Sequence, residues 1–349
     1  MQVTEAVEPG TKQARAAAGA APQNVVPLSD VAAVQRKQPA ERLANVERLR
    51  IVAMLEIVTF HVGGAVGLEE YRLPIVGGLG LPVFLLLNNA FNCTLAERRG
   101  TRAFLDAKVS RLLVPWLVWS AVYAAVVAAE RLRHAEPIAE AFLSWRALLG
   151  GTYTHLWFVP FAMFGSLSIA AAQARTRAVP HRSMAAWSLA LGTLLVALDG
   201  LILGRFDSQW PVQQWLFALP SLLLGFALGR VLLAADRTLS RRLAALLVAV
   251  AALVAAASWV APVGDIVRRY AVSMALVGVF FTWPGNLDAL SRRLTPLLFG
   301  VYLTHPLILR LYQAAHLPYV HPALLGVLLF IAAAGLVELL RKTPLRSLV

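Results

Sequence analysis

The stretch RIVAMLEIVTFH, residues 50 to 61, decides the fold of this chain. An arginine opens this largely apolar segment and a histidine ends it. At 100° per residue, eleven steps bring Arg50 and His61 within about 20° of one helix face, about 16 Å apart along the axis. With the arginine at a membrane surface, the histidine lies about halfway through the hydrocarbon, where an ionisable side chain is costly and indicates a functional site.

The composition of the whole chain is that of a membrane protein. Of its 349 residues, 58% are hydrophobic, and the mean hydropathy is +0.66. A soluble domain of this size needs more polar surface. Long apolar runs recur between short polar breaks, which predicts an all-α, polytopic transmembrane helical bundle. The net charge of +13 could suggest nucleic acid, but the basic residues lie in the breaks between apolar runs, so we exclude nucleic acid as a partner.

The apolar runs predict about ten spans embedded in membrane lipid. Residues 1–46 are predicted to form a disordered cytosolic tail, residues 47–341 the integral membrane domain, and residues 342–349 a cytosolic C-terminal tail. The predicted spans are 49–67, 76–96, 110–130, 154–174, 184–204, 212–234, 242–262, 266–283, 294–314 and 321–340.

The distribution of basic residues predicts the orientation of the bundle. With the N-terminus inside, about three-quarters of the 32 lysine and arginine residues fall in cytosolic segments. This bias predicts that both termini lie in the cytosol, which agrees with an even number of spans.

His61 is the first candidate for chemistry. A neutral imidazole is well suited to accept a hydroxyl proton near neutral pH, so we expect His61 to act as a general base. The alternative is a histidine that is merely hydrogen-bonded inside the bundle. Glu56 lies on the same predicted helix but about 120° away, so we expect it to pair with another segment.

Basic residues at the predicted cytosolic surface form a second group. Glu47 and Arg50 are three residues apart and can form an intrahelical pair. Lys108 and Arg111 share a face where the third span begins. Paired basic residues suit phosphate groups, which suggests a site for a phosphorylated cytosolic donor. The positive-inside bias of membrane proteins alone would also explain such a cluster.

Polar and aromatic residues inside other spans could line a substrate path. Asn89 lies in an asparagine-rich part of the second span, and amides at this depth join helices or line polar cavities. Trp157 begins the fourth span, where an interfacial role is the alternative. Tyr302 and His305 are neighbours on one face of the ninth span. The chain has one cysteine and no H-E-x-x-H pattern, so no metal site is predicted.

Four stretches together resemble the acyltransferase-3 family of ten-span membrane O-acyltransferases. They are VERLRIVAMLEIVTFH (46–61), AKVSRLLVPW (107–116), HLWF (155–158) and YLTHP (302–306), and the likeness covers about residues 45–340. The resemblance places the family's acidic residue, arginine and histidine on Glu47, Arg50 and His61, with Glu47 where aspartate is usual. It places the family's basic pair on Lys108 and Arg111. Where the family has Ser-Gly-Phe in the second span, this chain has Asn89-Ala90-Phe91.

The resemblance implies transfer of a short acyl group, often acetyl, from acyl-coenzyme A to a hydroxyl, with no permanently bound cofactor. It implies that His61 and Glu47 serve catalysis, and that Arg50, Lys108 and Arg111 bind the coenzyme. Asn89, Trp157, Tyr302 and His305 are candidates to bind substrate. Acceptors in the family are typically sugars of surface polysaccharides or their precursors, and sometimes other small molecules. A bacterial inner membrane is the expected location, and the chain resembles members without a fused esterase-like domain.

Two other functions are consistent with the sequence. Ten spans with intramembrane His, Glu and Asn also fit a proton-coupled solute transporter, although no inverted repeat is visible. An inactive relative that binds a partner in polysaccharide assembly is the other alternative.

Overall fold

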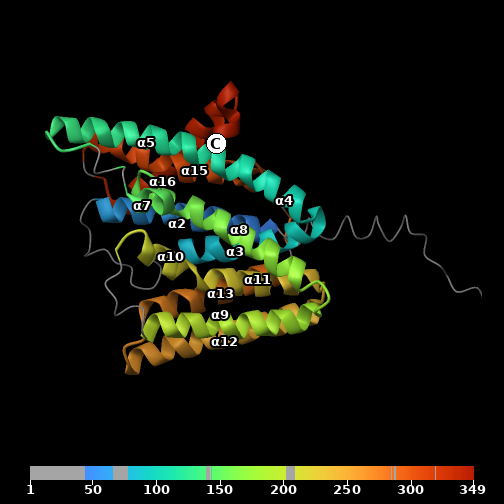
Figure 1. The fold of residues 1–349 in the computed structure, drawn as a ribbon. Helices are drawn as coiled ribbons and strands as arrows, with labels where there is room; N and C mark the ends of the chain where they lie inside the picture. The colour runs from blue at the N-terminus through green and yellow to red at the C-terminus, as the bar shows by residue number, and fades with distance from the viewer. Residues whose placement is uncertain are drawn as a thin grey trace, which may run out of the picture. The chain divides into compact units, whose positions relative to one another are not determined.

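The computed structural model describes residues 44–65, 78–138, 142, 144–201, 209–283, 285–286, 288–318 and 320–349. Nearly all of these residues are helical, and the described part of the chain contains no β-strand, which confirms the all-α prediction (Figure 1). Most of the predicted tail, residues 1–46, lies outside the described residues. The helical body begins at Ala44, three residues before the predicted domain boundary.

The helices follow one another with short connections. The long helical segments are α2 (Ala44–Ala65), α3 (Gly80–Arg99), α4 (Thr101–Lys108) with α5 (Val114–Arg133), α8 (Phe158–Arg175), α9 (His181–Leu201), α10 (Val212–Ala218) with α11 (Pro220–Leu233), α12 (Arg237–Val260), α13 (Asp265–Thr282), α14 (Ala289–Leu294) with α15 (Leu298–Ala314), and α16 (Pro322–Leu340). Shorter elements are the π-helical turn η2 (Val109–Leu113), α7 (Trp145–Gly150), and the 3₁₀ turns η3 (Thr154–Trp157), η5 (Thr295–Leu297) and η6 (Pro344–Leu348).

Seven of these helical stretches are long and apolar enough to cross a membrane, among the described residues. They are 101–133, 154–175, 181–201, 212–233, 237–260, 289–314 and 322–340. The protein is therefore a polytopic membrane bundle, while the total of ten spans stays a prediction. The other three predicted spans coincide with α2, α3 and α13. These helices are less apolar because α2 and α13 carry charges in their first turns and α3 carries three asparagines.

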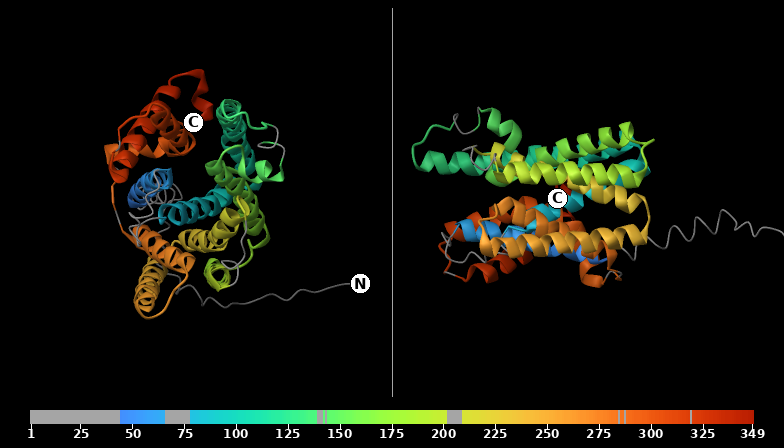
Figure 2. Two further views of the ribbon diagram at one scale, coloured as in Figure 1. Left: turned by 90° about the vertical axis from the view of Figure 1, so that its left-hand side faces the viewer. Right: turned by 90° about the horizontal axis from the view of Figure 1, so that it is seen from below.

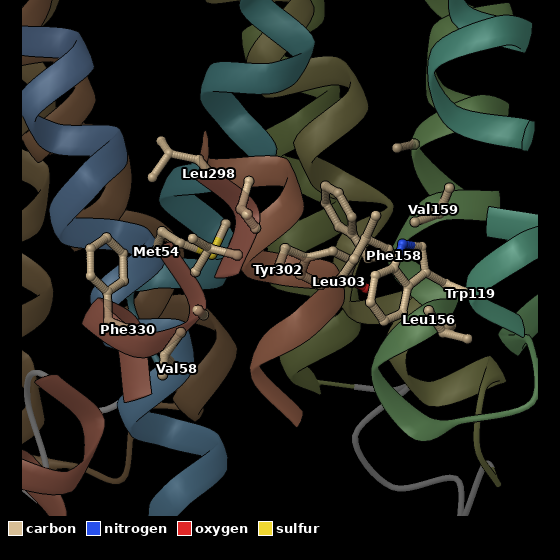
Figure 3. Packing of buried hydrophobic residues seen from close by; sticks show 14 of the residues in the cluster. Met54, Val58, Trp119, Leu156, Phe158, Val159, Leu298, Tyr302, Leu303 and Phe330 are labelled. Atoms are coloured by element: carbon tan, nitrogen blue, oxygen red, sulfur yellow. The ribbon is translucent and has the colours of Figure 1, made fainter. Parts of the chain in front are cut away.

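The less apolar helices α2 and α3 lie inside the bundle, where other helices cover much of their surface (Figure 2). One buried cluster joins α2 to α5, α8, α15 and α16, and includes Met54, Phe158 and Leu303 (Figure 3). A second cluster joins α2 and α3 to α9, α11 and α13. The outer helices α5, α9 and α12 expose most of their apolar side chains, as expected of surfaces that face lipid.

Two glycines of α11 allow its backbone to approach α3 closely. Gly225 and Gly229 form a small-xxx-small pattern, which is common where membrane helices pack together. A Cβ atom at Gly229 would lie 2.5 Å from Cβ of Cys93 and 2.8 Å from the carbonyl oxygen of Ala90. The backbone of α3 cannot move away cheaply, because Asn89 and its neighbours are buried on both sides.

Gly229→Ala is therefore expected to destabilise the protein by about 2 kcal/mol through overpacking. The matched control is Gly335→Ala in α16, where a new Cβ would have no atom within 4 Å. That control should be neutral or slightly stabilising, because alanine favours helix over glycine. Thermal unfolding of the two variants in detergent measures the difference, and equal midpoints would contradict the close α3–α11 contact.

The last two residues of the predicted C-terminal tail, 342–349, contact the bundle, while residues 342–347 are exposed. The carbonyl of Leu348 accepts a hydrogen bond from the indole nitrogen of Trp119, at 2.9 Å. Val349 lies against Gly300 of α15. The end of the chain therefore contacts both α5 and α15.

Candidate active site

Two histidines from distant parts of the sequence meet inside the bundle. His61 comes from α2 and His305 from α15, and their ring centroids are 5.0 Å apart. Nε2 of His305 lies 3.2 Å from Nδ1 of His61. His305 is almost completely buried, with 1% of its surface exposed. The structure thus brings together two of the predicted site residues.

Backbone carbonyls determine the protonation pattern of this pair. Nδ1 of His61 lies 2.9 Å from the carbonyl oxygen of Ile57, and Nδ1 of His305 lies 3.1 Å from that of Val301. A carbonyl can only accept, so we assign the proton of each neutral ring to Nδ1. Nε2 of His305 is then an acceptor for the Nδ1 proton of His61. Nε2 of His61 has no hydrogen-bond partner among the described residues and keeps its lone pair, which is the property a general base requires.

A third histidine, His155 of η3, lies beside this pair. Its ring centroid is 5.8 Å from that of His305 and 5.4 Å from that of Tyr302. Both ring nitrogens of His155 are buried and have no hydrogen-bond partner among the described residues. The hydroxyl of Tyr302 donates a hydrogen bond to the backbone carbonyl of His155, not to its ring. A buried imidazole with unused hydrogen-bonding capacity is costly, which suggests that a substrate supplies the missing partner.

A cavity of about 970 Å³ adjoins the histidines. Three of the predicted site residues line it, His61, Trp157 and Tyr302, and so do His155 and Glu56. Trp157 is buried, with 7% of its surface exposed, so protein surrounds its side chain. The cavity also reaches residues of α9, α10 and α13. Its size is that of a small-molecule site.

Arg50 does not line the cavity, but it contacts an aromatic residue that does. Its guanidinium pairs with Glu47 at 2.8 Å and lies 6.0 Å and 5.7 Å from the ring centroids of Phe84 and Phe91. Phe84 also lines the cavity that contains His61. Arg50 is thus one aromatic side chain away from the histidine site. Glu47 contacts Arg50 and lies about 21 Å from His61 along the helix axis, so its position favours orienting Arg50.

The predicted basic pair gathers near Arg50. Lys108 lies within electrostatic range of Arg111, Arg50 and Arg99, so residues from α2, α3 and the α4–α5 segment share one end of the bundle. Arg111 is in η2, and π-helical turns are frequent at functional sites. Of these four neighbouring cations only Arg50 has a carboxylate partner among the described residues, Glu47, so the group carries a net positive charge that favours an anion. The predicted donor-binding residues are therefore assembled at one end of the protein.

Asn89, a candidate to bind substrate, lies elsewhere. Its amide nitrogen donates to the carbonyl and the hydroxyl of Ser221, at 3.2 Å and 3.1 Å, and the residue is 1% exposed. It is not among the residues that line the cavity. Its place between α3 and α11 favours a role in joining helices, the alternative considered for these amides.

Glu56 pairs with another segment, as its helix angle predicts. Its carboxylate accepts hydrogen bonds from the backbone nitrogens of Gly78 and Gly80, the latter at 2.8 Å. Arg269 of α13 lies close enough to interact with it electrostatically. Glu56 therefore anchors the start of α3 at the edge of the cavity.

Several cavity residues were not predicted as site residues. They are Asp199 in α9, Trp210 before α10, and Gln213 and Gln214 in α10. Asp199 carries a recognisable signal, because an acid inside an apolar span indicates function. The others lie in a connecting segment and an ordinary helix, so only the three-dimensional structure places them in the cavity.

Within the described residues, no three His, Cys, Asp or Glu side chains are grouped to hold a metal ion. The model of the acyltransferase 3 family, described as an acyltransferase domain, matches residues 43–340. No curated protein and no solved structure matches the chain. The family match covers the whole helical body, including the histidine pair and the basic end. The chain belongs to the acyltransferase 3 family and is a multi-pass membrane acyltransferase.

Proposed function

We propose that this protein moves a short acyl group, in the first instance acetyl, from acyl-CoA to a hydroxyl of a sugar in a surface polysaccharide or glycan precursor. The observation that carries the proposal is the pair of contacts at Nδ1 of His61, which assigns the ring proton to Nδ1 and leaves Nε2 as the acceptor. Its Nδ1 is held by Ile57 and His305, and its ring lines a cavity large enough for an acceptor. In this proposal α2, α3 and α13 also cross a bacterial inner membrane, and both termini are cytosolic.

The donor binds at the basic end. Arg50, Lys108 and Arg111 receive the phosphates of acyl-CoA, and the guanidinium groups supply paired hydrogen bonds to phosphate oxygens. The separation of about 16 Å between Arg50 and His61 is of the order of the pantetheine arm. The thioester then reaches the cavity beside Phe84, which lies between the guanidinium and the histidines.

The chemical step is direct acyl transfer. Nε2 of His61 takes the proton of the acceptor hydroxyl, while the hydroxyl oxygen forms a bond to the thioester carbonyl carbon. The tetrahedral intermediate collapses, the carbon–sulfur bond breaks, and the CoA thiolate leaves with the proton that His61 received. The products are an O-acyl ester and CoA. His155, which has no partner among the described residues, is placed to donate a hydrogen bond to the oxyanion.

His305 is a positioning residue for His61. When His61 becomes cationic, its Nδ1 proton strengthens the hydrogen bond to Nε2 of His305, which stabilises the charge. His305→Leu is therefore expected to lower kcat about thirtyfold and leave KM for acetyl-CoA unchanged. His305→Gln keeps an acceptor atom and should restore most of the rate. Steady-state kinetics of both variants measure the effect, and equal losses in Leu and Gln would indicate only a packing role.

Transfer of radiolabelled acetyl groups from acetyl-CoA to isolated cell-envelope glycans tests the function. The protein is reconstituted in liposomes, and the labelled product is an alkali-labile ester. We expect His61-dependent labelling and one CoA released per ester formed. Counterflow of a labelled sugar without CoA release would instead support the transporter alternative.

A further inference from the structure

The cavity has a part that the transfer mechanism leaves unused. Its lining extends from the histidines to the C-terminal end of α9, the start of α10 and the N-terminal end of α13. These elements lie at the end of the bundle opposite α4 and the basic residues (Figure 1). Three side chains in this part have the properties of a binding site: Asp199, Trp210 and Gln214.

Asp199 provides a carboxylate that has no partner among the described residues. It lies two residues before the end of α9, in a helix apolar enough to span a membrane. It forms no hydrogen bond or ion pair with another described residue. Arg269 also lines the cavity, but its guanidinium pairs with Asp265 of its own helix at 2.6 Å. A partly buried carboxylate in an apolar helix is costly unless something donates hydrogen bonds to it.

Gln214 provides a second unused acceptor. Its side-chain oxygen is buried and has no hydrogen-bond partner among the described residues. Buried polar atoms are nearly always paired in folded proteins. Asp199 and Gln214 line one cavity and have no donor among the described residues. They therefore favour a ligand that is rich in donor groups, such as a molecule with several hydroxyls.

Trp210 provides a rigid aromatic surface. Its indole nitrogen donates to the carbonyl of Thr154 at 3.2 Å. One edge of the ring lies against Gly150, where a Cβ atom would be only 2.3 Å from the indole carbon Cζ2. The ring orientation is thus determined by the protein before any ligand arrives. A fixed aromatic ring with polar groups around it suits a ligand with both an apolar face and polar edges.

We propose that Asp199, Trp210 and Gln214 form a subsite that binds a neutral pyranose sugar of the acceptor. The C–H face of the ring packs on Trp210, and its hydroxyls donate to Asp199 and Gln214. The Asp199 carboxylate discriminates against anionic sugars such as uronates, because like charges repel across a partly desolvated site. This inference deepens the proposed function, since the same cavity presents a sugar hydroxyl to His61.

Binding of simple sugars to the intact protein, without acyl-CoA, tests the subsite. The probes are the methyl glycosides of glucose, galactose, mannose and N-acetylglucosamine, and methyl glucuronide as the anionic counterpart. The detergent is an amine oxide without a sugar headgroup, and the readout is tryptophan fluorescence with saturation-transfer NMR. We expect at least one neutral glycoside to bind saturably, at least tenfold more tightly than the glucuronide.

Asp199→Asn should weaken binding of the neutral glycoside about tenfold and reduce the discrimination against glucuronide, because a charged acceptor is lost. Gln214→Leu should also weaken binding. The matched control is Glu136→Gln, which removes an exposed acid outside the cavity. Absence of binding by all four neutral glycosides, tighter binding of the glucuronide, or unchanged affinity in Asp199→Asn would each overturn the subsite.

His61→Gln separates this inference from the proposed function. That variant should still bind the glycoside saturably, with the dependence on Asp199 retained, while losing acyl transfer. Sugar binding that depends on Asp199 without any acyl transfer in the wild type would contradict the proposed function and keep the subsite. Acyl transfer that is indifferent to Asp199 would keep the proposed function and contradict the subsite.

Discussion

Replacing His61 with glutamine is expected to lower kcat for acyl transfer about a thousandfold. Glutamine keeps a hydrogen-bonding group of similar size but cannot accept and hold a proton, so the general-base contribution is lost. KM for acetyl-CoA should change little, because the donor phosphates bind at the opposite end of the site in the proposed mechanism. Initial rates of CoA release with a glycan acceptor measure both constants.

His134→Gln is the matched control, because His134 is an exposed residue at the end of α5 and outside the cavity. It should have wild-type kinetics. Size-exclusion chromatography of both variants checks that the bundle is intact. A folded His61→Gln protein that retained more than a tenth of the wild-type rate would remove His61 from the catalytic step.

The second large effect is expected at Arg50. Arg50→Ala should raise KM for acetyl-CoA about a hundredfold, because a paired arginine–phosphate hydrogen bond is lost and Glu47 is left as an uncompensated negative charge. Arg50→Lys should recover part of the affinity, since lysine restores the charge without the planar fork of donors. Titration with a non-hydrolysable acetyl-CoA analogue measures binding alone, and its affinity should fall in the same order, from wild type to Arg50→Lys to Arg50→Ala.

Arg341→Ala serves as the control, because Arg341 is exposed at the end of α16 and does not contact the basic group. It removes one positive charge and should leave KM within about twofold, as expected of an exposed charge in salt-containing buffer. A similar rise of KM in both variants would show that general surface charge, and not Arg50, attracts the coenzyme.

The helices themselves could be predicted well from the sequence, because long apolar runs in a membrane have few alternatives to helix. Each of the ten predicted spans coincides with a described helix. The ends differ by several residues where polar residues continue a helix, as at Ala44 and Thr101. Hydropathy alone does not establish that α2, α3 and α13 cross the membrane. These helices carry charges and amides because other helices surround much of their surface.

The candidate site could be predicted only in part. The spacing of Arg50 and His61 is a local property of one helix, so the sequence contains it directly. The contact between His61 and His305 joins residues 244 positions apart, and no local pattern reveals it. The role of Asn89 could not be predicted, because an amide inside a span has the same sequence signal whether it joins helices or lines a cavity. Trp210 and Gln214 become candidate binding residues only because the structure places them in one cavity with Asp199.

The central claim is that the donor meets His61 from the basic end while the acceptor arrives from the opposite end. The most direct measurement is CoA release in proteoliposomes of known orientation, with impermeant acetyl-CoA on one face and glycan acceptor on the other. The account predicts His61-dependent release only when acetyl-CoA is on the face of Arg50 and Lys108 and the acceptor is on the face of Asp199. Equal release with the two substrates exchanged, or release unaffected by His61→Gln, would contradict it.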